Sequence, residues 1–143
     1  KMHLVELKRN PMQISNVQGL LQLIKIIKAG SYDIVWTNEP VMGIMTRLAA
    51  RIVRRKKVKI IYVAHGFHFY KGAPKKNWII YYPIEKIFSL FTDEIVTINN
   101  EDYNFARQNF TRAKVVKFPG IGINTSKFFK EVPYEVIEEK KES

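Results

Sequence analysis

Short runs of β-branched and apolar residues alternate along this chain with stretches of helical period, and this alternation restricts the fold more than any other feature. The runs that read as strands are residues 2–7, 32–37, 58–64, 93–98 and 113–119. The stretches that read as helices lie between them, at 15–30, 40–55, 77–91 and 100–110. Strands separated by helices are joined by crossovers that make neighbouring strands parallel. The sequence therefore predicts an α/β fold, a Rossmann-like parallel sheet with helices on both faces.

Residues of particular types mark the ends of these predicted helices. Ser15 has capping-box spacing with Gln18 at the start of the first helix, and Pro40 suits the first position of the second. Pro83 lies inside the third and should kink it, whereas Asn99 or the asparagine after it should cap the last. On the first helix we expect one apolar face to be buried, formed by Val17, Leu20, Leu21, Ile24 and Ile27.

The charge of the chain favours polyanionic partners. Its formal net charge is +11, although the last thirteen residues hold five acids and only two lysines. Residues 1–130 therefore carry 22 basic against 8 acidic side chains. Such a surplus suits nucleic acid, anionic lipid or phosphorylated small molecules, and it does not choose among them.

Other features of the composition exclude several classes of protein. The chain has no cysteine, which rules out disulfides and zinc-thiolate sites. No apolar run approaches the length of about 18 residues that a spanning helix needs, and the first ten residues lack the apolar core of a signal peptide. We therefore expect a cytoplasmic protein, either soluble or peripheral to a membrane.

Ligands of open parallel sheets bind beyond the carboxyl ends of the strands, and three loops of this chain fall at that edge. They are residues 37–40, 65–74 and 119–124. The middle loop, "HGFHFYKGAP", directly follows a predicted strand, so the imidazole of His65 should face a bound ligand. A histidine there can transfer a proton or hydrogen-bond a sugar hydroxyl or a phosphate.

The rest of this loop also carries groups that suit a ligand. Gly66 allows close approach of another group, and Lys71 can pair with phosphate. Phe67, Phe69 and Tyr70 offer flat faces to a sugar or a lipid. These rings and His68 can equally pack the loop against the sheet, and for His68 the sequence leaves both interpretations open.

Neither a metal site nor a dinucleotide site is expected. Two histidines at this spacing lack an evident third ligand. The "GIG" at 120–122 lacks the third glycine and the following helix of a dinucleotide fingerprint, and no Walker-type lysine loop is present.

Two basic segments account for much of the charge. Residues 51–59, "RIVRRKKVK", form a solvated helix end or a basic patch. In residues 70–82, "YKGAPKKNWIIYY", lysines stand beside aromatic and isoleucine side chains. This mixture suits a bilayer interface, with Lys75 and Lys76 near anionic lipid and Trp78 at headgroup depth.

Four segments of the chain resemble bacterial capsular and exopolysaccharide glycosyltransferases of family 4. They are "YDIVWTNEPVMGIMTRLAAR", "VAHGFHFYKGAPKKNWIIYYPIEKI", "TDEIVTINNEDYNFA" and "FPGIGINTSKF". The resemblance covers about residues 5–129 and implies the N-terminal, acceptor-side domain of a GT-B enzyme. Such an enzyme moves a sugar from a nucleotide-sugar donor to an acceptor, commonly a lipid-linked saccharide at the inner membrane face. It implies retention at the anomeric carbon, no metal and no cofactor.

The resemblance also implies roles for individual residues. His65 matches the histidine that faces the reacting sugars. The other positions at which contact with acceptor or donor is expected are Asn38, Glu39, Gly66, His68, Tyr70, Lys71, Gly120 and Gly122. The chain departs from the family at Trp36 and Asn38, where relatives often carry histidine, at Glu39, where they carry threonine, and at Asn124, where they carry aspartate. These departures leave the identity of the acceptor open.

By this resemblance the chain is expected to be an incomplete N-terminal domain at 1–130, followed by an acidic tail or linker at 131–143 and inactive by itself. Two other interpretations remain. One is a non-catalytic basic module that binds anionic membrane or nucleic acid, although no nucleic-acid-binding motif is present. The other is a different sugar-nucleotide enzyme such as an epimerase, which would need a glycine-rich loop and a tyrosine-lysine pair that we do not find.

Overall fold

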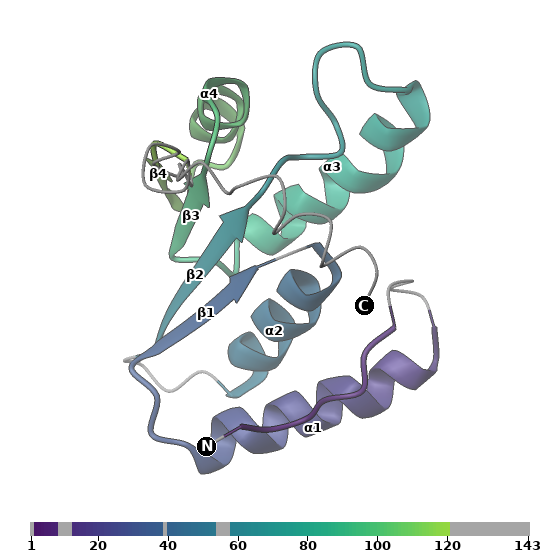
Figure 1. The fold of residues 1–143 in the computed structure, drawn as a ribbon, viewed down its shortest axis with the longest axis vertical. Helices are drawn as coiled ribbons and strands as arrows, with labels where there is room; N and C mark the ends of the chain where they lie inside the picture. Colours follow the sequence, from purple (N-terminus) through teal and green to yellow (C-terminus); the bar gives the residue numbers. More distant parts are fainter. Residues whose placement is uncertain (1, 9–12, 39, 54–57, 121–143) are drawn as a thin grey trace, which may run out of the picture.

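Figure 1 shows a computed structural model of the chain, which describes residues 2–8, 13–38, 40–53 and 58–120. Four of the five predicted strands and all four predicted helices are present. In chain order the elements are α1 (Ser15–Ala29), β1 (Ile34–Asn38), α2 (Pro40–Val53), β2 (Lys59–Ala64), α3 (Lys75–Ser89), β3 (Glu94–Thr97), α4 (Asn100–Asn109) and β4 (Lys114–Lys117).

The strands form one parallel sheet in the order β1-β2-β3-β4. In the register of the sheet, Val63 of β2 pairs with Asn38 of β1 on one side and with Val96 of β3 on the other. The carboxyl ends of these strands therefore meet at one edge. The prediction of an α/β fold with a parallel sheet is confirmed.

The prediction of a strand at residues 2–7 is wrong. This segment is extended, but it runs along α1 instead of joining the sheet (Figure 1). The backbone N–H of Glu6 donates to Gln22 Oε1, and that of Lys8 donates to Asn16 Oδ1 at 2.7 Å. Side chains of α1 thus take the hydrogen bonds that a neighbouring strand would otherwise provide.

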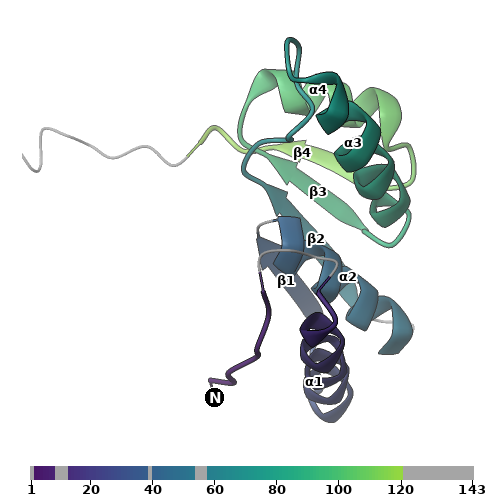
Figure 2. The same cartoon turned by 90° about the vertical axis from the view of Figure 1, so that its right-hand side faces the viewer.

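The three crossover helices, α2, α3 and α4, lie on the same face of the sheet. Tyr62 of β2 contacts Arg47 of α2 and Glu85 of α3, and it shares a buried cluster with Ala106 of α4. Figure 2 shows α2 and α3 on one side of the strands. Right-handed crossovers between strands that follow one another in spatial order produce this arrangement.

The opposite face of the sheet is apolar and carries none of these three helices. Because side chains alternate along a strand, Ile61 and Val63 point away from Tyr62, and they form a separate small cluster with Val96. On β1 the same face exposes Ile34 and Trp36. Helices were predicted on both faces of the sheet, but in the described residues the three crossover helices all lie on one face.

Aromatic side chains fill the space between the sheet, α3 and α4. Phe67 and Phe69, both buried, stack with ring centroids 4.9 Å apart. Around them pack Trp78 and Tyr82 of α3 and Phe105 of α4. The two phenylalanines of the 65–74 loop are thus part of the core, and the interpretation of the loop's rings as ligand contacts does not hold for them.

The helix ends agree with the predictions in part. Pro40 begins α2, and Asn99 caps α4 by accepting from the backbone N–H of Asp102. At α1 the helix begins at Ser15, so the cap position is Ile14 instead of the predicted Ser15, and Ile14 makes no side-chain capping bond. Within the described parts of the chain, we find no helix with the length and apolar character needed to cross a bilayer.

The predicted apolar face of α1 is wrong at two positions. Val17 is 54% exposed and Leu21 is 52% exposed. The buried positions of α1 are instead Asn16, Gly19 and Leu23, since the extended segment 2–8 lies against Asn16 and Gly19.

Candidate functional site

A pocket of about 400 Å³ lies at the carboxyl ends of β1 and β2. The described residues that line it are Asn38, Pro40, Tyr62, His65, Gly66 and His68. These residues come from the end of β1, the first turn of α2, the body of β2 and the loop after β2. The structure therefore brings the first two predicted loops together at the edge where parallel sheets bind ligands.

His65 is exposed at the rim of this pocket. It follows Ala64, the last residue of β2, so a buried strand fixes its backbone. The next residue, Gly66, has a φ of 148°, a backbone conformation that side-chain-bearing residues rarely adopt. An imidazole held at this position can donate or accept a hydrogen bond with a molecule in the pocket.

His68 lines the same pocket but also has a packing partner. Its ring stacks on Tyr81 of α3, with centroids 4.6 Å apart and an interplanar angle of 28°. Its backbone oxygen accepts from Asn77 Nδ2 at 2.9 Å. Both interpretations left open for His68 therefore have structural support, since one residue reaches the pocket and braces the loop against α3.

Two carboxylates of α4 hold the 65–74 loop in place. The backbone N–H of Phe67 donates to Asp102 Oδ2 at 3.3 Å, and that of Lys71 donates to Glu101 Oε1 at 2.6 Å. Asn99 Nδ2 also donates to Asp102, at 2.6 Å. Neither acid was predicted as a site residue, although both stand in the quoted segment "TDEIVTINNEDYNFA" and Asp102 has capping-box spacing from Asn99.

Burial raises the pKa of the Asp102 carboxyl above its usual range, and the hydrogen bonds from Asn99 and Phe67 oppose this only in part. We expect Asp102→Ala to lower the free energy of unfolding by about 1–3 kcal/mol, because the N–H of Phe67 would lose its acceptor in a buried position. Thermal denaturation followed by circular dichroism measures this effect. Glu101→Ala is the matched control: Glu101 is exposed, so water can satisfy Lys71. Equal losses for both variants would contradict this account.

Tyr62, which was not predicted as a site residue, lines the pocket and is buried. Its hydroxyl donates to Glu85 Oε1 at 3.1 Å, and Glu85 Oε2 accepts from both terminal nitrogens of Arg47. Burial is the main cause that raises the pKa of Tyr62 far above its usual range, so its hydroxyl stays protonated as a donor. Tyr62 is thus a fixed wall of the pocket and not a proton acceptor.

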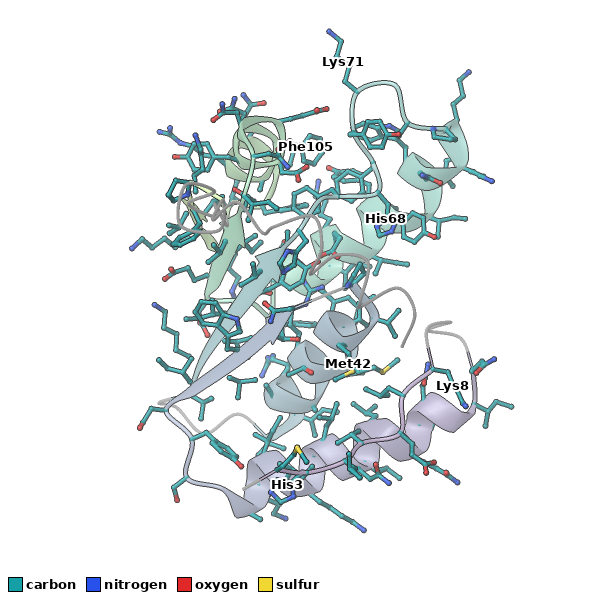
Figure 3. All side chains as sticks on the ribbon, viewed as in Figure 1. His3, Lys8, Met42, His68, Lys71 and Phe105 are labelled. Atoms are coloured by element: carbon teal, nitrogen blue, oxygen red, sulfur yellow. The ribbon has the colours of Figure 1, made fainter. Side chains whose placement is uncertain are left out.

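Not all of the remaining residues that were predicted to contact a ligand lie at the pocket. Asn38 lines the pocket, and its Oδ1 accepts from Trp36 Nε1 at 3.1 Å. Tyr70 and Lys71 are exposed toward the tip of the loop, where Lys71 points away from the body of the domain (Figure 3). Gly120, with a φ of 96°, follows β4 and is not among the pocket residues. Glu39, Gly122, Asn124 and the tail at 131–143 lie outside the described residues.

Of the predicted membrane contacts, Lys75 and Lys76 are exposed on the first turn of α3. Trp78 is half-buried, with its ring 5.5 Å from that of Phe69 and 5.6 Å from that of Phe105. Its indole therefore packs against the aromatic cluster, whereas the predicted contacts Lys75 and Lys76 are exposed. No group of three potential metal ligands comes together in the parts of the chain that the structure describes.

Comparison with known proteins shows to which family the sequence is similar. The profile of the glycosyl transferase 4-like family matches residues 1–99. A protein of Bacillus subtilis (strain 168) named "Putative glycosyltransferase EpsD" is 46% identical over 132 residues, which are 92% of this chain and 35% of the relative.

Two further relatives come from other bacteria. An Escherichia coli protein named as UDP-Gal:alpha-D-GlcNAc-diphosphoundecaprenol alpha-1,3-galactosyltransferase is 32% identical over 94 residues, 66% of this chain and 24% of the relative. An uncharacterized 41.2 kDa protein in the cps region of Klebsiella pneumoniae is 30% identical over 101 residues, 68% of this chain and 28% of the relative.

The chain thus spans between about a quarter and a third of the length of these curated relatives. The match of the family profile nevertheless covers most of the chain, from the first residue through β3 and into the first loop after it. The parallel sheet, the pocket at its carboxyl edge and this match agree: the chain belongs to the glycosyl transferase 4-like family.

Proposed function

We propose that the protein takes part in the transfer of a sugar from a nucleotide-sugar donor to a lipid-linked saccharide, in the synthesis of an exopolysaccharide or capsular polysaccharide. The observation that carries the proposal is the pocket in which His65, His68 and Asn38 meet at the carboxyl ends of two parallel strands. Membership of the family and the names of the relatives support it. One of those names specifies a UDP-sugar and a diphosphoundecaprenol-linked acceptor.

In the proposed reaction, a hydroxyl oxygen of the acceptor bonds to the anomeric carbon of the donor sugar. The bond from that carbon to the phosphate oxygen breaks, and the nucleoside diphosphate leaves with the electron pair. We propose that the configuration at the anomeric carbon is retained in one step, in which the hydroxyl attacks from the same face of the sugar that the phosphate leaves. Because the two groups lie on that face together, the hydroxyl proton can pass to the phosphate oxygen. The reaction as proposed needs neither a metal ion nor a cofactor.

His65 has the position to assist this step. Its imidazole stands at the rim of the pocket on a backbone fixed by β2, so it can hydrogen-bond a sugar hydroxyl or a phosphate without first being ordered. The first turn of α2 also lines the pocket at Pro40, and the N-terminus of a helix favours a negatively charged group. These features suit the acceptor side of the reaction.

The test uses the protein expressed from its complete gene, incubated with labelled nucleotide sugars and a diphosphoundecaprenol-linked saccharide. We expect label to enter the lipid fraction, the new glycosidic bond to have the anomeric configuration of the donor, and the rate to be unchanged by a chelator. If no common nucleotide sugar is transferred although the protein is folded, the proposed activity is wrong. If the anomeric configuration is inverted, only the proposed retention is wrong. If a chelator abolishes the rate, only the proposed independence of metal is wrong.

A further inference from the structure

The solvent-facing side of α3 is apolar and basic. Ile79 is 73% exposed, Ile80 is 53% exposed and Ile87 is 54% exposed. Residues spaced three or four apart share a face of a helix. The exposed residues that share this face, which we term the α3 docking face, are Lys75, Lys76, Ile79, Ile80, Pro83, Lys86 and Ile87.

This arrangement differs from that of an ordinary surface helix. A helix that covers a core buries its apolar side chains and turns polar ones to the solvent. The inward side of α3 is filled, since Trp78 and Tyr82 join the aromatic cluster and Glu85 and Ser89 are buried. The isoleucines of the α3 docking face are therefore a second apolar set that the core does not use. Grouped exposed apolar side chains mark interaction surfaces more often than single ones do.

The charge of the α3 docking face has one sign. The only acidic residue of α3 is Glu85, and its carboxylate is buried with Arg47 and Tyr62. Lys71, at the tip of the preceding loop, adds a further exposed ammonium group near the start of the helix (Figure 3). The nearby acidic residue Glu101 belongs to α4, and its carboxylate accepts a hydrogen bond from the backbone N–H of Lys71.

We propose that the α3 docking face binds the surface of an anionic lipid bilayer. Isoleucine side chains can enter the boundary between headgroups and acyl chains, while the lysines around them meet lipid phosphates. The phosphates of a nucleic acid could also bind the lysines, but binding to nucleic acid would not explain why three isoleucines are exposed. An isologous contact with a second copy would bring the lysines of two identical faces together without acidic partners. The combination of charge and apolar surface thus favours lipid.

The position of the α3 docking face also suits the proposed reaction. α3 begins directly after the 65–74 loop, which carries His65 and His68 of the pocket. A bilayer bound along this helix would therefore lie close to the acceptor site. This link to a lipid-linked acceptor rests on the proposed function, whereas binding of the bilayer does not.

The test measures co-sedimentation of the protein, expressed from its complete gene, with vesicles of phosphatidylcholine alone or mixed with phosphatidylglycerol. We expect binding to the mixed vesicles that weakens as salt is added. The pair Lys75→Gln and Lys76→Gln should weaken it about 30-fold, since each such lysine contributes about 1 kcal/mol and 1.4 kcal/mol is tenfold. The pair Ile79→Gln and Ile80→Gln should weaken it at least about tenfold, because two apolar side chains lose their burial.

Matched controls come from α1, which exposes the same kinds of side chain. Val17→Gln with Leu21→Gln, and Lys25→Gln with Lys28→Gln, change two exposed apolar and two exposed basic residues. These controls should bind vesicles like the wild type. The proposal is overturned if they lose as much binding as the α3 variants, if neutral and mixed vesicles bind equally, or if DNA binds more tightly than mixed vesicles at equal salt. It is also overturned if the isoleucine pair abolishes a dimer seen by light scattering and leaves vesicle binding intact.

Discussion

Replacing His65 with alanine should slow sugar transfer by about 100- to 1,000-fold, which is the usual cost of removing one positioned hydrogen-bonding group that stabilises the transition state. The thermal unfolding midpoint should stay where it is, because the side chain of His65 is exposed and belongs to none of the core clusters that the described residues form. The measurement is transfer of labelled sugar to the lipid-linked acceptor, with thermal unfolding followed in parallel on the same preparation.

The other two histidines provide the comparison. His3→Ala should leave the rate unchanged, since His3 is exposed on the segment beside α1, far from the pocket (Figure 3). His68→Ala should lose some activity and some stability, because His68 both lines the pocket and stacks on Tyr81. A His65→Ala enzyme that transfers sugar at nearly the wild-type rate would show that His65 is not part of the reaction.

Arg47→Ala should lower the free energy of unfolding by about 3–5 kcal/mol, the cost of leaving a buried charge without its partner. Arg47 is fully buried, and its two terminal nitrogens donate to Glu85 Oε2 at 3.1 and 3.0 Å. Its guanidinium carbon, Cζ, lies 4.0 Å from the centre of the Tyr62 ring. Its removal leaves the Glu85 carboxylate in the interior with Tyr62 alone. Urea denaturation followed by the fluorescence of Trp78, which packs in the aromatic cluster, measures the change.

Two controls separate the buried charge from other effects. Arg51→Ala removes an exposed arginine from the same helix and should change stability by no more than about 0.5 kcal/mol. The combined variant Arg47→Met, Glu85→Leu and Tyr62→Phe removes the charges together and should cost less than Arg47→Ala alone, since apolar replacement of a buried pair is often tolerated. If the combined variant costs more, packing rather than charge explains the loss.

The alternation of strands and helices predicted most of the fold because it depends on local periods. Proline, with its fixed φ, marked the start of α2 at Pro40, and Asn99 marked the start of α4 by its capping hydrogen bond. The strand predicted at 2–7 was wrong for a reason that no local pattern contains. A strand needs a neighbour, and in the described residues this segment finds the side chains of α1 instead.

The site could be predicted only where a residue's position follows from the end of a strand. His65 and Asn38 belong to that kind, and both line the pocket. The places of Tyr62 and Arg47 could not be predicted in this way, because both side chains are buried with Glu85. Glu85 lies 23 residues beyond Tyr62 and 38 beyond Arg47. The packing of Trp78 against the core was not predicted for a related reason, since α3 is apolar on both sides and its sequence period does not say which side faces the core.

The spatial order of the strands repeats their order along the chain, and this has a consequence for synthesis on the ribosome. Each strand of the described sheet pairs with the one made just before it, through a single helix. Contacts between near neighbours close quickly, and chains emerge at about 5–20 residues per second. The sheet can therefore grow one strand at a time, and Arg47 waits for Glu85 until α3 has left the exit tunnel. Protease resistance of stalled nascent chains should accordingly rise in steps, one for each new strand, and a single late step would exclude this order of assembly.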